Sequence, residues 1–399
     1  MLKIDYQNSQ ISLNEKSLES ILEKIKNRET PSFETEKPDL EQIKNIAKKY
    51  EKYKNVILIG NGGSRTSAYA FYNSLFGFRN DVNFEFLTSC EPDWIFELKK
   101  KHSPQDTLVV AISKSGDNIN NIEPLMSFLE YTVVAITGDN QAALHEIAKK
   151  MNWEIVIHPE VGGRFSAMTT CGLVPACLMG LDIEKIYEGA KIGYEKYSFQ
   201  KNISENDALR LAAYFFELEK KGYDEIFASI YSLSLSGLLP LIVQLVHESA
   251  GKQGMGQTIV GDYSPESQHH TNQRFFGGKK NMIGLLMGIE NSENDFNVEI
   301  PENLKEISFK DHGLEMLQGM KASDTLLFDM KGVLGHCIEK KIPAIEIFAD
   351  KISLQNIGEA IVFWQYFSVY SALLREQDPY NQPEVEFSKV VSFDLRLKR

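Results

Sequence analysis

The stretch LIVQLVHESAGKQG carries polar side chains that could move a proton. Gln244 and Glu248 stand four residues apart at the end of a predicted helix, so they share one face of it. A carboxylate placed there can act as a general base, which contributes about a hundred- to ten-thousandfold in rate. The alternative is an ordinary surface pair between Glu248 and Lys252, which are also four residues apart.

Two neighbouring histidines, His269 and His270, lie in the polar segment PESQHHTNQRFFGG. Histidine transfers protons near neutral pH, and neighbours in an extended loop point in different directions, so we expect at most one of them to face a shared site. A metal site built from both, with His247 and Glu248, is the alternative. The HExxH motif would need a histidine where Gly251 stands, and the sequence therefore predicts no metal.

Two short loops that follow predicted strands could hold a phosphate group. GNGGS offers Gly63 and Ser64, and AISKSGDN offers Ser113, Lys114 and Ser115. Glycines let the backbone approach an anion, and a helix start adds free N–H groups with a partial positive charge. Hydroxyls at such a turn suit a phosphate monoester when no metal is present. The two loops together predict a phosphosugar site.

A dinucleotide-binding fold is the rival interpretation of the first loop. The GxGxxG fingerprint needs a third glycine where Arg65 stands, and that side chain would obstruct close helix packing. Glu91, after the next strand, keeps this alternative open because an acidic residue there could bind a ribose.

Arg164 is a candidate cation for the same site. It stands in VGGRFS, directly before an apolar helix. It could be a structural cap or ion pair, or it could stabilise a developing oxyanion, a role worth about 3 kcal/mol.

These side chains need a scaffold, and the chain alternates short β-branched runs with amphipathic segments. The runs in the first half are NVILIG at 55 to 60, FEFLT near 85 to 88, TLVVAIS at 107 to 113, YTVVAIT at 131 to 137 and WEIVIH at 153 to 158. Those in the second half are YDEIFASIYS, QTIVGDYS, MIGLLMGIE and IPAIEIFA, with long helical patterns such as LQNIGEAIVFWQYFSVYSALLR. The alternation predicts an α/β protein with parallel sheets covered by helices on both faces. Ligands of such sheets bind beyond the carboxyl ends of the strands.

The chain divides into four predicted parts. The first fifty residues are charged and helical in period, and a charged stretch near 192 to 207 separates two α/β halves. We predict an N-terminal helical segment at 1–50, a first domain at 51–200, a second at 201–375 and a C-terminal segment at 376–399.

Composition limits the partners. The 43 Lys and Arg against 55 Asp and Glu give a net charge of -12, which repels nucleic acid and anionic membranes. The N-terminus has no signal-peptide core, and no stretch approaches the roughly 18 apolar residues of a membrane span, so we expect a cytoplasmic protein. The cysteines show no CxxC spacing and are expected to be reduced packing residues. They are Cys90, Cys171, Cys177 and Cys337.

Taken in chain order, GNGGS, ISKSG, VGGRFS, QLVHESAGK, SQHHTNQ and DPYNQPEVEFSK resemble the successive motifs of the glucose-6-phosphate isomerase family. The resemblance covers most of the chain, and VGGRFS and ESxGK are its most specific parts. It implies two sugar-isomerase (SIS) domains, each a three-layer α/β/α structure with a doubly wound parallel sheet. It also implies interconversion of glucose 6-phosphate and fructose 6-phosphate through a cis-enediol(ate), in glycolysis and gluconeogenesis, with no cofactor.

The resemblance also implies a role for each site residue. Glu248 would move the proton between C2 and C1, Arg164 would stabilise the enediolate, His269 would assist ring opening, and Lys389 would come from the C-terminal motif. The histidine loop of this family reaches the neighbouring subunit's site, which implies a homodimer that shares His269 in this way. The expected substrate-binding residues are Gly63, Ser64, Ser113, Lys114, Ser115, Asn118, Gln244 and Gln382.

Two departures from the family pattern concern the phosphate loop and the C-terminal motif. Asp117 and Asn118 follow SKSG where the family usually has threonines. A carboxylate beside a phosphate is repulsive, so Asp117 would cap a helix from a rotated position or weaken binding, with Arg65 as the compensating charge. Glu384 and Ser388 replace usual glycines, so we expect a changed loop near Lys389.

Three alternatives remain open. A relative with this fold could also accept mannose 6-phosphate. A non-catalytic SIS regulator that binds a phosphosugar would need Ser64 and Ser113, but not Glu248 together with His269. A nicotinamide-dependent oxidoreductase would bind its cofactor and need no phosphate on its substrate.

Overall fold

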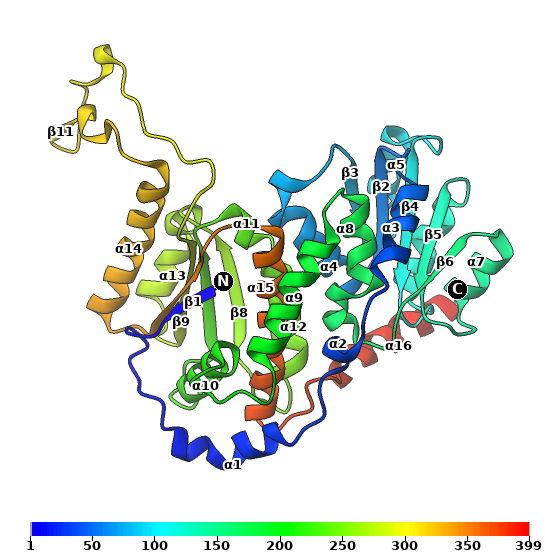
Figure 1. Cartoon of the computed structure of the whole chain (residues 1–399), viewed down its shortest axis with the longest axis horizontal. Helices are drawn as coiled ribbons and strands as arrows, with labels where there is room; N and C mark the ends of the chain where they lie inside the picture. The colour runs from blue at the N-terminus through cyan, green and yellow to red at the C-terminus, as the bar shows by residue number, and fades with distance from the viewer. Residues whose placement is uncertain (1, 399) are drawn as a thin grey trace.

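The computed structural model describes residues 2–398, which form two five-stranded sheets side by side (Figure 1). The first sheet is parallel throughout and has the order β3-β2-β4-β5-β6. All five strands predicted in the first half are present. They are β2 (Asn55–Gly60), β3 (Asn83–Leu87), β4 (Thr107–Ser113), β5 (Thr132–Thr137) and β6 (Glu154–Ile157).

Both faces of the first sheet are buried, as the continuous apolar runs predict. Successive residues of a strand point to opposite faces, so Ile57 and Val109 pack on one side while Leu58 and Val110 pack on the other. The first of these faces is covered by α5 (Pro92–Lys101), α6 (Ile119–Leu125) and α7 (Ala143–Met151), and the second by α3 (Leu40–Lys49), α4 (Gly63–Ser74) and α8 (Thr170–Leu178).

The second sheet has the order β1-β12-β9-β7-β8 and is parallel except for β1. The four strands predicted for the second half are present. They are β7 (Glu225–Ile230), β8 (Thr258–Tyr263), β9 (Met282–Ile289) and β12 (Ala344–Ala349). One face packs on α10 (Asp207–Glu219), α12 (Leu239–Ala250) and α15 (Leu354–Leu374), and the other on α13 (Thr271–Gly277) and α14 (Ala322–Lys340).

The N-terminal segment differs from the helical expectation in one element. Leu2–Asp5 form β1, which pairs antiparallel with β12 at the edge of the second sheet. The helical period holds only after this strand, in α1 (Glu15–Lys26), the short α2 (Ser32–Thr35) and α3. The division of the chain at residues 50, 200 and 375 stays a prediction.

The two sheets are joined by a close helix crossing between α9 (Ile183–Tyr197) and α15 (Figure 1). Gly189 and Gly358 allow it. A Cβ atom on Gly189 would lie 1.9 Å from the Gln355 carbonyl oxygen, and one on Gly358 would lie 2.1 Å from that of Ile186. Only hydrogen fits at either position.

The expectation that no segment resembles a membrane span is wrong by length and composition. Leu233–Ala250 and Leu354–Leu374 have mean hydropathies of 1.3 and 1.2, and both are long enough to cross a membrane. The window in α15 is, however, completely buried inside the protein, which is the environment of a core helix.

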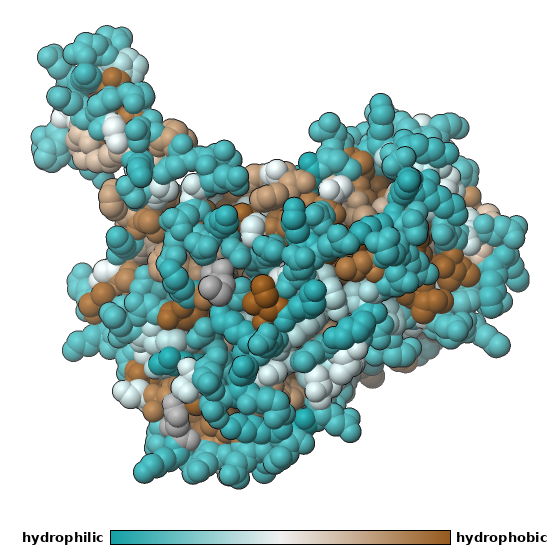
Figure 2. Space-filling view, viewed as in Figure 1, coloured by the Kyte–Doolittle hydropathy of each residue, from teal (hydrophilic) through white to brown (hydrophobic). Residues whose placement is uncertain are grey.

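A segment at 291–321 extends from the second sheet before α14 and stands away from the body (Figure 1). It contains the two-residue strands β10 (Ser308–Phe309) and β11 (His312–Gly313). Figure 2 shows a mostly hydrophilic surface, hollowed between this projection and the lobe of the first sheet. The chain ends in α16 (Glu386–Leu397), which lies beneath the first sheet in Figure 1.

Candidate active site

A cavity of about 840 Å³ lies at the carboxyl ends of β2 and β4, where the parallel-sheet rule places ligands. This size suits a small molecule. The lining includes seven of the predicted substrate-binding residues, together with Asp117 and His158. The seven are Gly63, Ser64, Ser113, Lys114, Ser115, Asn118 and Gln382, and Lys389 joins them from α16.

The first predicted loop reaches the cavity because Gly63 has no side chain. A Cβ atom on Gly63 would lie 1.8 Å from the Gly163 carbonyl oxygen, so the β2–α4 loop and the turn before Arg164 touch backbone to backbone. Ser64, in the first turn of α4, is buried at the cavity wall. The helix start therefore presents its N–H groups and a hydroxyl to the same space.

The second loop, after β4, is fixed by its own side chains. Ser113 Oγ accepts a hydrogen bond from the Gly116 N–H at 3.2 Å, and Lys114 forms a 2.9 Å ion pair with Glu160. Asn118 caps α6 by accepting from the Asn120 N–H at 3.1 Å. Each of these predicted residues thus also holds the loop in shape.

Asp117 is turned away toward a neighbouring helix. Its Oδ1 accepts the Ala143 N–H at 2.9 Å, at the start of α7. The expected capping is therefore present, but on α7 rather than on the helix that follows the loop. Arg65 does not line the cavity. Its guanidinium lies 4.4 Å from the centre of the Tyr69 ring, so the structure gives no support to Arg65 as the compensating charge.

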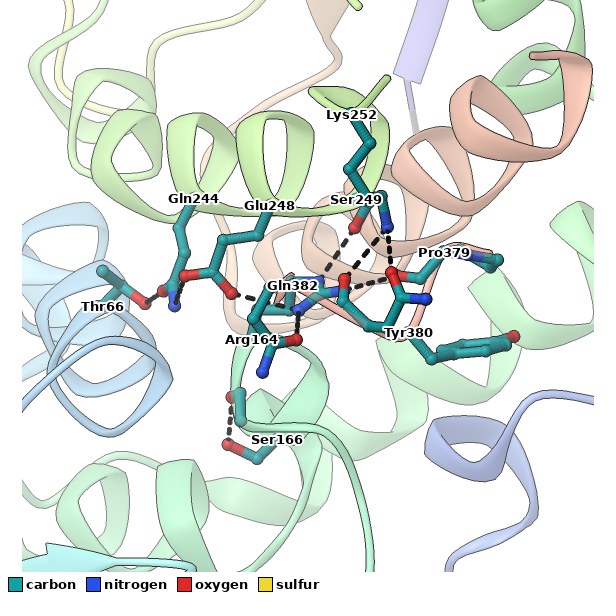
Figure 3. Close-up of polar contacts among 12 residues, drawn as sticks. Thr66, Arg164, Ser166, Gln244, Glu248, Ser249, Lys252, Pro379, Tyr380 and Gln382 are labelled. Atoms are coloured by element: carbon teal, nitrogen blue, oxygen red, sulfur yellow. Dashed lines mark hydrogen bonds and ion pairs between the residues drawn. The ribbon is translucent and has the colours of Figure 1, made fainter. Parts of the chain in front are cut away.

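Glu248 is oriented by donors on both of its carboxylate oxygens. Gln244 Nε2 donates to Oε1 at 2.9 Å, and Thr66 Oγ1, from α4, donates to Gln244 Oε1 at 2.7 Å. Arg164 Nη1 donates to Glu248 Oε2 at 3.0 Å. Figure 3 shows Gln244 and Glu248 side by side on α12, with Arg164 below them. The shared helix face predicted from the spacing is confirmed.

Arg164 has the most buried charge of the site, with a side chain only 2% exposed. Burial lowers the pKa of Arg164, and the neighbouring Glu248 carboxylate opposes this shift. Nε donates to Ser249 Oγ at 2.9 Å, which fixes the guanidinium plane against α12. The Glu248 side chain is 26% exposed, so the pair joins a buried cation to a carboxylate that solvent reaches.

The loop at 378–382 is held by two cations. Arg164 donates to Gln382 Oε1 at 2.8 Å and to the carbonyl oxygens of Pro379 and Asn381, which brings its hydrogen bonds to five, one for each N–H group. Lys252 Nζ donates to the Asp378 carbonyl and, at 3.0 Å each, to the Asn381 carbonyl and Oδ1. Burial lowers the pKa of Lys252, and the Arg164 charge lowers it further. The alternative of a surface pair between Glu248 and Lys252 is wrong, since Lys252 is buried and turned to this loop.

α16 closes one side of the cavity and brings Lys389 to it. Lys389 Nζ donates to Glu386 Oε1 at 2.9 Å within the first turn of the helix. At the other end, Arg396 donates to both Glu123 oxygens on α6, at 2.5 and 2.6 Å. The helix is therefore tied to the body at both ends, through the 378–382 loop and through Arg396.

The histidines do not meet Glu248 within one chain. His269 is exposed at the end of a short 3-10 turn and does not line the cavity. His270 Nε2 lies 3.6 Å from Asp262 Oδ2. His247 Nε2 accepts the Ile259 N–H at 3.0 Å. Over residues 2–398 no group of three or more His, Cys, Asp or Glu side chains is placed to hold a metal ion.

Sequence reasoning missed three residues of this site. Thr66 orients Gln244, Ser249 orients Arg164, and Lys252 holds the C-terminal loop. Ser249 and Lys252 lie in the ESAGK run, and Thr66 lies one helical turn after Gly63. All three residues are therefore close in sequence to motifs that sequence reasoning identified. Their partners lie 85 to 178 residues away in the chain, and no local pattern identifies such contacts.

Known proteins are similar to this chain in sequence over most of its length. The family model for phosphoglucose isomerase matches residues 40–397. A glucose-6-phosphate isomerase from Methanocaldococcus jannaschii is 30% identical over 354 residues, covering 86% of this chain and 84% of that protein. One from Fusobacterium nucleatum is 29% identical over 390 residues, with 90% and 85% covered.

Solved structures share the fold. A hypothetical protein from Thermus thermophilus superposes with a TM-score of 0.89 at 24% identity, covering 100% of both chains. A glucose-6-phosphate isomerase from Chlamydia trachomatis gives 0.76 at 17% identity, covering 96% of this chain and 75% of the other. The predicted fold class, with SIS-type parallel sheets, is confirmed.

Proposed function

The chain belongs to the phosphoglucose isomerase family, and from this premise we propose that it interconverts glucose 6-phosphate and fructose 6-phosphate with Glu248 as the base. The observation that carries the proposal is the Gln244–Glu248–Arg164 arrangement, which lies outside the cavity lining and meets it through the hydrogen bond from Arg164 to Gln382. An aldose–ketose isomerase needs one carboxylate able to face two adjacent carbons and a fixed positive charge near the oxygen atoms.

In this mechanism the substrate phosphate binds the two loops at the ends of β2 and β4. Ser64, Ser113 and Ser115 supply hydroxyls, and Lys114 supplies charge. Glu248 removes the proton from C2 of the open-chain sugar and returns it to C1, through a cis-enediol(ate). All five N–H groups of Arg164 donate to protein acceptors. Arg164 therefore stabilises the developing negative charge through the fixed position of its positive charge.

Ring opening needs a separate acid–base group, and we assign it to His269 of a second copy of the chain. The exposed His269, which lies outside its own chain's cavity, supports this assignment. The active molecule is then a homodimer in which each subunit completes the other's site. Lys389, at the cavity wall, assists the sugar oxygens.

The test is isomerisation of fructose 6-phosphate by purified protein in EDTA, for wild type and Glu248→Gln. We expect chelator-resistant turnover that falls at least about a hundredfold in the variant, as for a lost general base. Glu339→Gln, at an exposed position on α14, is the matched control and should keep full activity. Unchanged activity in Glu248→Gln would reject Glu248 as the base. Mannose 6-phosphate, assayed in parallel, tests whether the site selects at C2.

A further inference from the structure

His158 is a buried titratable residue of the cavity that the mechanism above does not use. It follows β6, lines the cavity with Ser113 and Lys114, and is 2% exposed. Its Nδ1 lies 2.8 Å from the Pro159 carbonyl oxygen. A carbonyl only accepts hydrogen bonds, so Nδ1 carries the hydrogen, and in the neutral ring Nε2 is a bare acceptor.

The second ring nitrogen is available to a ligand. Within residues 2–398, His158 Nε2 makes no hydrogen bond to the protein. The charges that bear on the ring are Lys114 and Glu160, which pair with each other at 2.9 Å, while Asp117, Glu386 and Lys389 are the other charged residues of the cavity wall. Burial lowers the pKa of His158, so the ring is neutral near pH 7 when the cavity holds no anion.

A neutral His158 cannot donate a hydrogen bond from Nε2 to a phosphate dianion. The dianion offers only acceptor oxygens, and the ring would meet it with a lone pair on Nε2. Adding one proton to Nε2 turns this atom into a donor and places a positive charge beside the anion, which favours the charged form of the ring. The proton comes from solvent on binding and returns to it on release.

We propose that His158 is a phosphate-binding residue that takes up one proton when the substrate's phosphate enters the cavity and then donates through Nε2 to a phosphate oxygen. The identity of the ligand rests on the proposed function. The site would couple substrate affinity to pH, with affinity falling as pH rises through the pKa of the ring in the complex.

The test measures binding of glucitol 6-phosphate, which has no carbonyl group and cannot be isomerised. Calorimetric titration near pH 7 in two buffers of different ionisation enthalpy gives the number of protons taken up. The ligand's own second ionisation, with a pKa of about 6, contributes equally to every variant, so differences between variants belong to the protein. We expect uptake by wild type and less of it by His158→Gln, which does not titrate.

Two further variants separate binding from packing. His158→Asn can keep the hydrogen bond to the Pro159 carbonyl but has no atom at the Nε2 position, so it should bind roughly ten- to a hundredfold more weakly. His158→Gln, with a donor nearer to Nε2, should recover part of this loss. His145→Asn is the matched control. The Nδ1 atom of this buried histidine also lies 3.0 Å from a carbonyl oxygen, that of Gly138. His145 does not line the cavity, so the variant should bind the ligand as tightly as wild type does.

Wild-type affinity and proton uptake in His158→Asn would overturn the proposal. Binding with the expected uptake by a protein that shows no isomerase activity would sustain the proposal for His158 while rejecting the proposed function. The two failures are thus distinguishable.

Discussion

Glu248 is positioned by residues from two distant parts of the chain together with neighbours on its own helix. Thr66 acts through Gln244, Arg164 contacts the carboxylate directly, and Ser249 fixes Arg164 in turn. Because both oxygens of Glu248 accept a hydrogen bond, the carboxylate is held in one orientation before the substrate arrives. The hydrogen bonds of the site therefore restrict the conformation of the Glu248 side chain.

His247, the residue before Glu248, gives the protein a pH-dependent stability. His247 Nε2 must be unprotonated to accept the Ile259 N–H, and burial lowers the pKa of His247 below its ordinary 6.5. The unfolded chain then binds more protons as pH falls below 6.5, so the contribution of this residue is fully present above that pH and is lost toward its folded pKa.

We therefore expect the free energy of unfolding to fall from about pH 7 to about pH 5.5, with a smaller fall in His247→Gln. The glutamine amide oxygen can accept the same bond without titrating. The difference between the two proteins cannot exceed ~1.4 kcal/mol per pH unit, the limit for one proton. Urea unfolding at both pH values measures it, and equal slopes would contradict the assignment.

The residues that sequence reasoning identified are those with a local signature. Gln244 and Glu248 share a face because they are four apart, and Ser64 and Ser113 follow strands whose carboxyl ends meet. Lys252 was open to the wrong interpretation because its partners, Asp378 and Asn381, are more than 120 residues away. Spacing along the chain predicts which residues share an element, but it does not predict which distant segment packs against that element.

Between elements, the crossing of α9 and α15 depends on two glycines. Helices rarely approach so closely, and here each glycine faces a main-chain carbonyl of the other helix. Since α15 is buried from Ile357 to Leu374, the crossing fixes how the two sheets lie relative to each other. The sequence predicted α15 from its apolar pattern, but no local pattern predicts that Gly189 and Gly358, 169 residues apart, lie in one helix crossing.

Gly358→Ala should destabilise the protein by about 1–3 kcal/mol, because the new methyl group would overlap the Ile186 carbonyl and force the helices apart. Gly332→Ala, inside α14 with nothing within 4 Å of its Cβ position, is the matched control. Alanine favours a helix over glycine by up to about 1 kcal/mol, so the control should be neutral or stabilising. Urea unfolding compares the two, and an equally stable Gly358→Ala would show that the crossing can widen without cost.

The whole molecule is acidic, yet its proposed substrate is an anion. Three cations lie near the proposed substrate site, Lys114 and Lys389 in the cavity wall and Arg164 behind it, and Asp117 and Glu386 lie in the same wall. In the proposed mechanism a single chain lacks one catalytic group at its cavity, because His269 does not line it. The proposed function therefore requires two copies of the chain.

This requirement predicts complementation between two inactive variants. In a mixed dimer of Glu248→Gln and His269→Gln, one site has both substitutions and the other has neither. Random reassociation after mixing should restore roughly a quarter of wild-type activity, because half of the dimers are mixed and each has one intact site. If both residues acted in the same chain, mixing would restore nothing. Sedimentation of each variant checks that both still assemble.

The strand that the sequence pattern did not predict has a consequence for how the protein behaves in concentrated solution. Without β1, the edge of β12 would offer its unpaired N–H and C=O groups to any other extended chain, the usual start of aggregation. β1 covers that edge and is itself a poor template, because it is four residues long and carries Lys3, which pairs with Glu290 at 2.6 Å. A short charged strand thus prevents further strand pairing at the β12 side of the second sheet.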